Sequence, residues 1–479
     1  MKNVISKEHK VEIRDFFEWF DKYYIVCMAC VSPMVIWLNF NGRGMQGLYE
    51  IYPVFKRVIL AGFDPAVALG TNLTFPMWGY GWFLILTENK LLILCIQHVL
   101  ALVCVCFFIK YIEQKELLSV MGARIFKFLL LISVPFYAFH SLRWPYSIAA
   151  SLFLIALVFL HKAFEDSAQK NAWVKHIVIS GLLFGVIFNF RSDFFMMPFG
   201  LSLLVLIFFC ISSQRNRLGF VLKKIVLWLM IIYSCLFPWA LFTHHVSGHA
   251  CLTSTNTGHA CFIGLGNDRT NIWGIEEHDG CPKMHALVDA AFGEKHTTLD
   301  YQADMLLKRT FFTYISDRPW DYLKKCLVTF KRSLTEGVYQ GEFFYMHSYD
   351  KEENPYFKFN NRKIVYQIIT CPKDILCNHK EDLFRVCMQR LSYVTGGLVI
   401  FFSYCLLLFS LYYAITTKNL FFLFICAALC YQTLMNILVH YKPGYTGNMY
   451  VLFVLNLTYA LVQLYTSLCK QKSKIMKIK

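Results

Sequence analysis

Charged residues are scarce over long stretches of this sequence. Asp, Glu, Lys and Arg make up 16% of its 479 residues, whereas a typical soluble domain contains about 25%. Hydrophobic residues make up 57%. Ten apolar runs reach the length of about 17–25 residues that spans a bilayer, and none has Asp or Glu between its ends: 24–40, 90–112, 123–139, 145–162, 174–190, 194–212, 221–243, 391–416, 418–439 and 447–468. This pattern excludes an ordinary soluble protein and predicts an all-α polytopic membrane protein with about ten transmembrane helices.

Several common motifs are also absent. The sequence contains no P-loop, no HExxH and no GxSxG, so the chemistry attached to those motifs is not predicted. The stretch GLGNDRTNIWG (264–274) resembles a phosphate loop in composition but lacks GxGxxG, and we interpret it as a tight backbone loop over a substrate. We find no internal repeat, and we expect no cleavable signal peptide because the first 20 residues are charged.

The positive charge lies on one side of the predicted spans. The net charge is +16. The segments 1–23, 110–127, 162–175, 213–224, 415–419 and 469–479 hold 22 of the 47 Lys and Arg residues, and the short segments on the other side hold 7. The large loop 244–390 is neutral, with 18 basic and 18 acidic residues. The positive-inside rule therefore places both termini in the cytoplasm and the large loop outside, in a bacterial inner membrane or an ER-type membrane. The excess charge then faces the membrane surface, and nucleic-acid binding is not predicted.

This topology divides the chain into three parts. Residues 1–243 form an N-terminal transmembrane module whose first external loop, 41–89, begins with an amphipathic interfacial helix in LYEIYPVFKRVILAG (48–62). We expect the following residues, 63–83, to form a loop that lies on the membrane surface or dips into it. Residues 244–390 form an external domain of mixed structure, with helices predicted at 300–315 and 318–334 from their 3.6-residue apolar spacing. Residues 391–479 contain the last helices and a basic tail.

Seven of the 18 cysteines lie in the large loop, on the side where disulfides form. Cys251–Cys261 and Cys371–Cys377 are the pairs closest in sequence, but the connectivity is not readable from spacing. His259, His285 and His379 lie near these cysteines, yet no CxxC spacing supports a zinc site.

The segment FNFRSDFFMMP (188–198) places Arg191 and Asp193 at the outer membrane face. The simplest interpretation is a polar turn with an internal salt bridge. A functional interpretation follows from the small number of alternatives, because Glu50, Asp64, Glu88 and Asp193 are the only external carboxylates outside the large loop. The basic groups at the same level are Arg43, His140, Arg143, Arg191, His244, His245, His440 and Lys442. If they converge on one cleft, that cleft suits a lipid-linked phosphate.

Five stretches together resemble the GT-C fold glycosyltransferases, integral membrane enzymes that use lipid-linked sugars. The resemblance covers most of the chain in the order of that family. It rests on LYEIYPVFKRVILAGFDP (48–65), GLLFGVIFNFRSDFFMMP (181–198), LTSTNTGHACFIGLGNDRTNIWGI (252–275), ISDRPWDYLKKCLVTFKRSL (315–334) and VHYKPGYTGNMYVLFVL (439–455).

The resemblance implies transfer of a sugar from a polyprenyl-phosphate donor to a glycan, lipid or protein acceptor on the external face. It implies Glu50 or Asp64 as the catalytic base. Together with the external basic groups named above, it leads us to expect a substrate-binding set of Arg43, Arg143, Arg191, Asp193, His440, Tyr441 and Lys442. The family allows a divalent metal, for which the sequence offers no clear ligand set. The chain departs from the family where Met45 and Gln46 replace the acids expected in the first loop, and where His440-Tyr441 replaces an Arg-Tyr pair.

Three alternatives stay open. An O-antigen polymerase or ligase also combines many spans with one large external loop. A transporter or flippase would place ionisable residues at mid-membrane in paired halves. A non-catalytic assembly subunit on the same fold would account for the missing acids of the first loop.

The predicted topology can be tested by labelling introduced cysteines with a membrane-impermeant maleimide in a cysteine-free background. His285→Cys in the large loop should react in intact cells. Ser6→Cys and Ser473→Cys should react only after permeabilisation. Reaction of the loop and the tail from the same side would contradict the topology.

Overall fold

The computed structural model describes residues 7–40, 51–62, 64, 78–86, 89–141, 145–165, 172–211, 215–267, 272–293, 296–335, 380–440 and 447–478. Within these ranges all regular secondary structure is helical, and there is no strand. The predicted all-α class is confirmed, and the regular structure in the described part of the large loop is helical, with turns and irregular segments between the helices.

Among the described residues, nine helical segments are long and apolar enough to cross a membrane. The α6 and α7 pair, which bends by 57°, gives a tenth if it counts as one span. These nine or ten segments agree with the predicted count of about ten transmembrane helices, and the chain is an integral multi-pass membrane protein. The segments are α1 (Lys7–Phe40), α5 (Lys90–Gln114), α6 (Val120–Leu131) with α7 (Val134–His140), α8 (Pro145–Glu165), α9 (Ala172–Phe190), η2 (Ser192–Phe194) with α10 (Met197–Ile211), α11 (Leu218–Ser234) with α12 (Phe237–Ser247), α19 (Lys380–Thr416), α20 (Leu420–Leu438) and α22 (Tyr450–Ile478).

Proline accounts for the breaks inside two of these segments. Pro135 lies in the first turn of α7 and Pro238 lies in the first turn of α12. A proline has no N–H for the preceding helical turn, so the chain bends and starts a new helix there. The ends of α1 and α19 also differ from prediction, because both helices begin well before their apolar runs at 24 and 391. Hydropathy marks the part of a helix that meets lipid, not the end of the helix.

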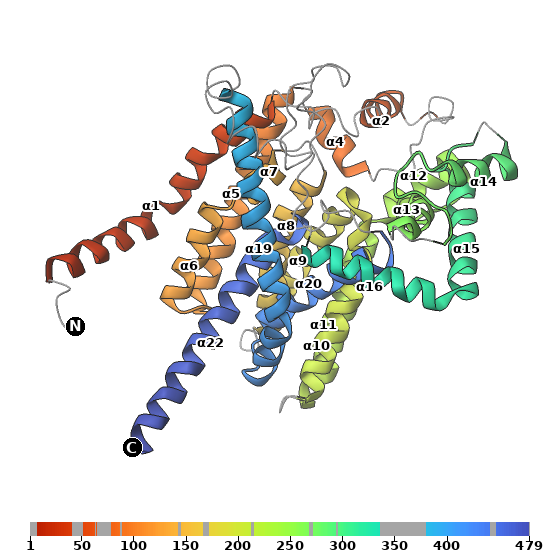
Figure 1. Ribbon diagram of the computed structural model, residues 1–479. Helices are drawn as coiled ribbons and strands as arrows, with labels where there is room; N and C mark the ends of the chain where they lie inside the picture. Colours follow the sequence, from red (N-terminus) through yellow and green to blue (C-terminus); the bar gives the residue numbers. More distant parts are fainter. Residues whose placement is uncertain are drawn as a thin grey trace.

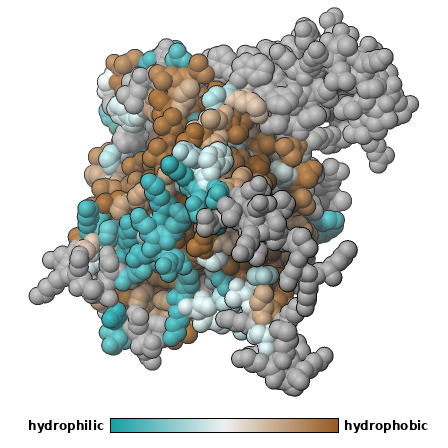
Figure 2. Space-filling view, turned by 90° about the vertical axis from the view of Figure 1, so that its left-hand side faces the viewer, coloured by the Kyte–Doolittle hydropathy of each residue, from teal (hydrophilic) through white to brown (hydrophobic). Residues whose placement is uncertain are grey.

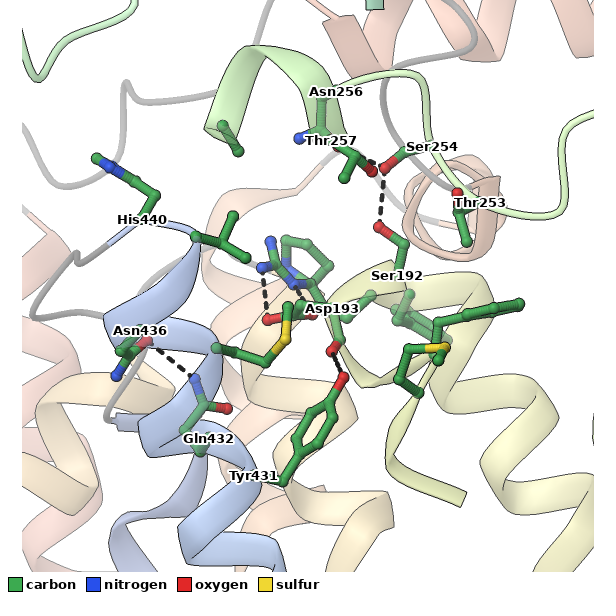
Figure 3. A pocket seen from close by; sticks show the side chains of 18 of the residues that line it. Ser192, Asp193, Thr253, Ser254, Asn256, Thr257, Tyr431, Gln432, Asn436 and His440 are labelled. Atoms are coloured by element: carbon green, nitrogen blue, oxygen red, sulfur yellow. Dashed lines mark hydrogen bonds and ion pairs between the residues drawn. The ribbon is translucent and has the colours of Figure 1, made fainter. Parts of the chain in front are cut away.

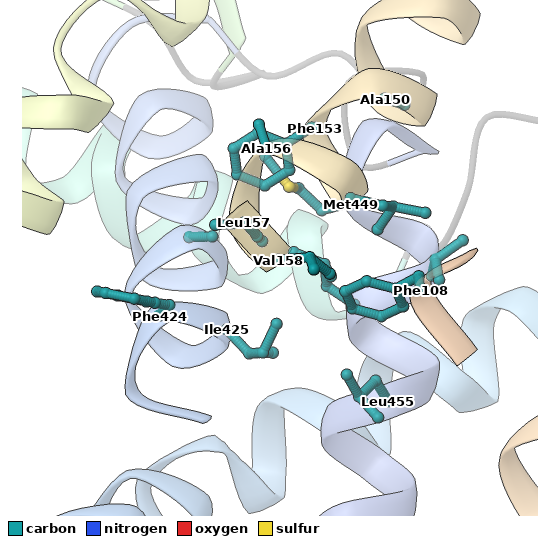
Figure 4. Close-up of a cluster of buried hydrophobic side chains, with 14 of the residues drawn as sticks. Phe108, Ala150, Phe153, Ala156, Leu157, Val158, Phe424, Ile425, Met449 and Leu455 are labelled. Atoms are coloured by element: carbon teal, nitrogen blue, oxygen red, sulfur yellow. The ribbon is translucent and has the colours of Figure 1, made fainter. Parts of the chain in front are cut away.

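The centre of the bundle is α8. It is 78% buried over its most apolar window, more than any other span. Figure 4 shows side chains of α8 packed against those of α5, α20 and α22, including Phe153, Phe108, Ile425 and Leu455. Small residues such as Ala149 and Ala156 line α8 and are fully buried. Small side chains let neighbouring helices approach closely, which is the usual packing of membrane helices.

Shorter helices lie above the bundle and along one side of it (Figure 1). They comprise α2 (Ile51–Leu60), α4 (Trp78–Leu86), α13 (Thr257–Gly264), η4 (Leu265–Asn267), α14 (Pro282–Phe292), α15 (Tyr301–Asp317) and α16 (Pro319–Thr335); η3 (Arg215–Arg217) and η5 (Gly447–Met449) precede α11 and α22. The segments predicted as helices at 300–315 and 318–334 are α15 and α16. The prediction of a loop over 63–83 is wrong at its end, because α4 begins at Trp78.

An ion-pair cluster lies between α1, α5 and α6. Asp21 accepts hydrogen bonds from Arg124 at 2.8 Å and from Lys127 at 2.9 Å, and Lys127 also forms an ion pair with Glu113 at 2.6 Å.

On the side shown in Figure 2, apolar surface covers much of the molecule and hydrophilic residues gather mainly in its lower half. A hydrophilic patch on this side extends from the lower part up into the middle of the apolar surface.

Candidate functional site

A cavity of about 370 Å³ lies where α9, α13 and α20 meet. Three groups of residues line it. The end of α9 and the turn after it contribute Phe190, Arg191, Ser192, Asp193, Phe195 and Met196. The start of α13 and the residues just before it contribute Thr253, Ser254, Asn256, Thr257 and Ala260. One face of α20 and the two residues after it form the third group. Pro145 from α8 and Lys308 from α15 complete the lining. Residues more than 200 positions apart in sequence therefore share one pocket (Figure 3).

Arg191 and Asp193 form a two-point ion pair in this pocket. Nε and Nη2 of Arg191 donate to the two carboxylate oxygens of Asp193, each at 2.9 Å. The guanidinium carbon lies 3.3 Å from the centre of the Tyr146 ring, in the stacked arrangement that arginine adopts on aromatic faces. Both charged side chains are about one-fifth exposed (20% and 23%). The guanidinium is thus fixed in orientation on two sides.

Hydrogen bonds from three other elements fix the turn that carries this pair. Tyr431 on α20 donates to the carbonyl of Asp193 at 2.6 Å, and Tyr233 on α11 donates to the carbonyl of Phe195 at 2.8 Å. The hydroxyls of Ser192 and Ser254 lie 2.8 Å apart, which joins the turn to the segment before α13. These bonds hold the turn against α20, α11 and the segment before α13.

The N-terminus of α13 lies at the pocket, and a hydrogen bond from its first turn to α15 fixes this position. The buried carboxylate of Asp304 accepts hydrogen bonds from the backbone N–H of Gly258 and from Lys308, both at 2.5 Å. Asp304 therefore satisfies one of the open N–H groups of the helix start and pairs with the lysine that lines the pocket. Gly258 allows this contact, because a Cβ there would lie 2.1 Å from the carbonyl oxygen of Asp304.

The last turn of α20 is capped by α16. Lys325 donates to the carbonyls of Ile437 at 2.9 Å and Val439 at 3.4 Å, and Tyr322 donates to that of Leu438 at 2.6 Å. These carbonyls have no partner within α20, and a cation near them also interacts favourably with the helix dipole. Lys325 is fully buried, and burial lowers its pKa to about 8. The hydrogen bonds from Lys325 and Tyr322 fix the end of α20, and His440, which lines the pocket, directly follows this end.

A second ion pair, between Arg332 and Glu277, lies close enough to His440 to interact with it electrostatically. Arg332 donates to both carboxylate oxygens of Glu277, at 2.7 and 3.2 Å, and Asn267 donates to the same carboxylate at 2.8 Å. Partial burial raises the pKa of Glu277, but the hydrogen bonds from Arg332 and Asn267 outweigh it and hold the pKa below its usual value; His440 acts in the same direction. This pair ties η4 to the end of α16.

The residues predicted from sequence fall into three groups. Arg191, Asp193 and His440 line the same pocket. Asp64 lies after α2 with its side chain exposed and is not among the lining residues. Glu50, Arg43, Arg143, Tyr441 and Lys442 lie outside the described residues. Of the other candidate basic groups, His140 is buried against Ser147, and His244 and His245 lie at the exposed end of α12.

The sequence interpretation missed several lining residues: Ser192, Ser254, Asn256, Thr257, Lys308, Tyr431, Gln432 and Asn436. One signal was available for α13, because Asn256 before TGHACFIG is a favoured residue at a helix N-cap. From the sequence we predict a loop from Gly264 onward and assign no helix to 257–264.

The structure also bears on the predicted cysteine pairs and on the possible zinc site. Cys251 and Cys261 are both free thiols, so they do not pair with each other, and Cys371 and Cys377 lie outside the described residues. His259 contacts Thr298 and Asp279. No group of three or more His, Cys, Asp or Glu side chains in the described ranges is arranged to hold a metal ion.

Comparison with protein-family models gives no match, and comparison with curated protein sequences gives no significant match. Among solved structures, the chain is similar to the oligosaccharyltransferase of Archaeoglobus fulgidus, an enzyme with the GT-C fold. The apo form shows 12% identity and a TM-score of 0.47 over 96% of this chain and 52% of that chain. The complex with Zn and sulfate shows 13% identity and a TM-score of 0.45 over 94% and 51%. The complex with an inhibitory peptide and a dolichol-phosphate shows 12% and 0.45 over 95% and 52%. This chain spans about half the length of those structures.

The contact between α13 and α20 can be tested at Gly264. A Cβ at this position would lie 1.8 Å from the carbonyl oxygen of Val439. Gly264→Ala should therefore lower the free energy of unfolding by about 1–3 kcal/mol and weaken ligand binding in the pocket. The measurement is thermal unfolding in lipid nanodiscs.

Gly200→Ala on α10 is the matched control, because a Cβ there meets nothing within 4 Å. Alanine is the better helix former by about 1 kcal/mol, so this variant should be as stable as the parent or more so. Equal stability of the two variants would contradict the close contact of Gly264 with α20.

Proposed function

We propose that the pocket binds the phosphate of a lipid-linked sugar and that the chain is a membrane glycosyltransferase. The donor is a polyprenyl-phosphate sugar, and the acceptor receives the sugar on the external face. The observation that carries this proposal is the orientation of Arg191, whose guanidinium is held between the Tyr146 ring and Asp193 in a pocket at the end of membrane-spanning helices. A guanidinium fixed in this way is suited to gripping two phosphate oxygens.

The other lining groups support an anionic ligand of low charge. Lys308, the hydroxyls of Ser192 and Ser254, and the first turn of α13 face the same space. A helix N-terminus and hydroxyl donors favour phosphate oxygens. Both cations already have carboxylate partners, Asp193 and Asp304. A sugar phosphodiester carries one negative charge, which suits a pocket whose two cations are largely neutralised.

The apolar part of the lining supports a lipid-linked ligand. Phe190, Phe195, Met196 and Met435 line the pocket beside the polar groups. Met196 is half exposed, at 54%, and the neighbouring helices α10 and α20 are transmembrane segments. A phosphate in the pocket would thus have an apolar path from the membrane for its tail.

The proposed reaction is a direct displacement at the anomeric carbon. A carboxylate takes the proton of the acceptor hydroxyl as its oxygen forms a bond to the anomeric carbon. The bond from that carbon to the phosphate oxygen breaks, and polyprenyl phosphate leaves with the electron pair. Arg191 and Lys308 stabilise the negative charge that develops on the phosphate. Glu50 and Asp64 of the first loop remain the proposed bases, and a divalent metal remains compatible with the superfamily.

A second candidate is a lipid-phosphate-binding subunit without catalysis. One observation favours it. Among the described lining residues, Asp193 is the only carboxylate, and both of its oxygens bond Arg191. In that case the pocket would hold the lipid phosphate but no sugar would be transferred.

Lipid-phosphate binding tests the role of Arg191. Binding of radiolabelled farnesyl phosphate to protein in nanodiscs is compared with binding of farnesol, which has the same tail. Arg191→Ala should weaken phosphate binding about tenfold or more, because a charged hydrogen bond contributes about 1.5–3 kcal/mol. Arg191→Lys should fall between, since lysine keeps the charge but loses the planar fork.

Arg124→Ala is the control for removing a paired arginine. Arg124 also bonds an aspartate, Asp21, and lies 5.0 Å from the centre of the Phe17 ring, but it belongs to α6, away from the pocket. It should bind farnesyl phosphate as the parent does. Equal binding of farnesol and farnesyl phosphate, or parent-like binding by Arg191→Ala, would rule out the proposed phosphate site.

The base is tested by Glu50→Gln and Asp64→Asn, made separately, because each substitution keeps the size and removes the charge. One of them should lower the rate of sugar transfer by about 10²–10⁴-fold while farnesyl phosphate binding stays at the parent level. Transfer at the parent rate in both variants would exclude these two residues. Phosphate binding by the parent without transfer from any polyprenyl-phosphate sugar would favour the non-catalytic candidate.

A further inference from the structure

Two amide side chains on α20 line the pocket and are not part of the proposed phosphate site. Gln432 and Asn436 are one helical turn apart, and they are 3% and 1% exposed. Nε2 of Gln432 donates to Oδ1 of Asn436 at 3.2 Å. Figure 3 shows both on the same helix as Tyr431, across the pocket from the segment that carries Ser254 and Asn256.

The Asn436 amide is incompletely satisfied. Among the described residues, its Nδ2 group has no hydrogen-bond partner, although it is fully buried. Buried polar groups nearly always have partners, and those that do not call for an explanation. Asn436 lines the cavity, so a ligand there can supply the missing acceptor.

The Gln432–Asn436 pair differs chemically from the charged and hydroxyl groups of the lining. Arg191, Lys308 and the hydroxyls of Ser192 and Ser254 offer positive charge and donors. The α20 pair offers uncharged groups, each of which combines donors with an acceptor. Sugar hydroxyls are themselves both donors and acceptors, so a pair of adjacent amides matches two neighbouring hydroxyls of a sugar ring.

We propose that Gln432 and Asn436 form the subsite for the sugar ring attached to the phosphate, and that this sugar is uncharged. This inference rests on the proposed function and adds the class of sugar. The amides carry no charge that could pair with a carboxylate or ammonium group on the ring, and the charged residues of the lining are already paired, Arg191 with Asp193 and Lys308 with Asp304. An unpaired buried charge is strongly unfavourable. Neutral hexoses and N-acetylated hexosamines meet the requirement.

The size of the pocket limits how much sugar is enclosed. A cavity of about 370 Å³ is near the lower end of the range of about 300–1,000 Å³ that small-molecule sites occupy. It therefore suits the phosphate and the first ring rather than a buried oligosaccharide. Any further sugars of the donor would lie outside the pocket.

The test compares four ligands on one polyprenyl tail: the bare phosphate and its glucosyl, N-acetylglucosaminyl and glucuronosyl derivatives. Binding is measured with the full chain in nanodiscs. At least one neutral sugar should bind the parent protein tenfold or more tightly than the bare phosphate, and the glucuronosyl derivative should not. In the double variant Gln432→Met/Asn436→Leu, this gain should disappear, while bare phosphate binds within about twofold of the parent.

Two controls separate the possible causes. Leu434→Ala changes a half-exposed residue of the same helix, which does not line the pocket, and should keep the gain from the sugar. The double variant should unfold at or above the parent temperature, since it removes the amide group that lacks a partner. A substantially lower unfolding temperature would show that the amides serve the packing of α20, and would overturn the inference.

Other outcomes are equally decisive. A gain that survives in the double variant, no gain from any neutral sugar, or tightest binding of the glucuronosyl derivative would each overturn the sugar subsite while leaving the phosphate site in place. Failure of the parent to bind even the bare phosphate would overturn the proposed function itself, together with this inference.

Discussion

The pocket depends on one constraint, which is the placement of the Arg191–Asp193 ion pair at the end of a membrane helix. Removing two charges from water costs free energy that their attraction offsets only in good geometry. The geometry here is a two-point pair at 2.9 Å, stacked on Tyr146. Holding it requires bonds to the turn from Tyr431, Tyr233 and Ser254, and these are the contacts that bring α20, α11 and the α13 segment together around the cavity.

The large loop is joined to the bundle by the same kind of interaction. Lys325 and Tyr322 on α16 satisfy the open carbonyls at the end of α20, and Asp304 on α15 satisfies an open N–H at the start of α13. Helix ends with unsatisfied backbone groups are thus the points where loop and spans meet. Because a buried backbone group without a partner is costly, these contacts also fix where His440, Lys308 and the start of α13 stand.

The sequence predicted the spans and part of the site, for a physical reason in each case. Long apolar runs have few alternatives to a membrane helix, and an ion pair in such surroundings identified Arg191 and Asp193. Gln432 and Asn436 were not predicted as site residues, because α20 is apolar enough to be a transmembrane helix and two uncharged amides do not change that prediction. Lys308 was not predicted as a lining residue, because an Asp304–Lys308 pair at i,i+4 spacing is typical of the solvent-exposed face of a helix. Only the packing of α13 against α15 turns it toward the cavity.

The way the charges are paired explains how the pocket combines stability with binding. An unpaired Arg191 or Lys308 would attract phosphate more strongly, but it would destabilise the protein whenever the pocket lacks a ligand. Asp193 and Asp304 remove that penalty and also weaken the attraction for anions. Binding must then draw on many modest terms: the fixed guanidinium, the hydroxyls, the helix start, an apolar tail and the neutral amides of α20. Such a pocket selects for a whole molecule with phosphate, ring and tail in the right order, because no single group of the ligand supplies enough free energy alone.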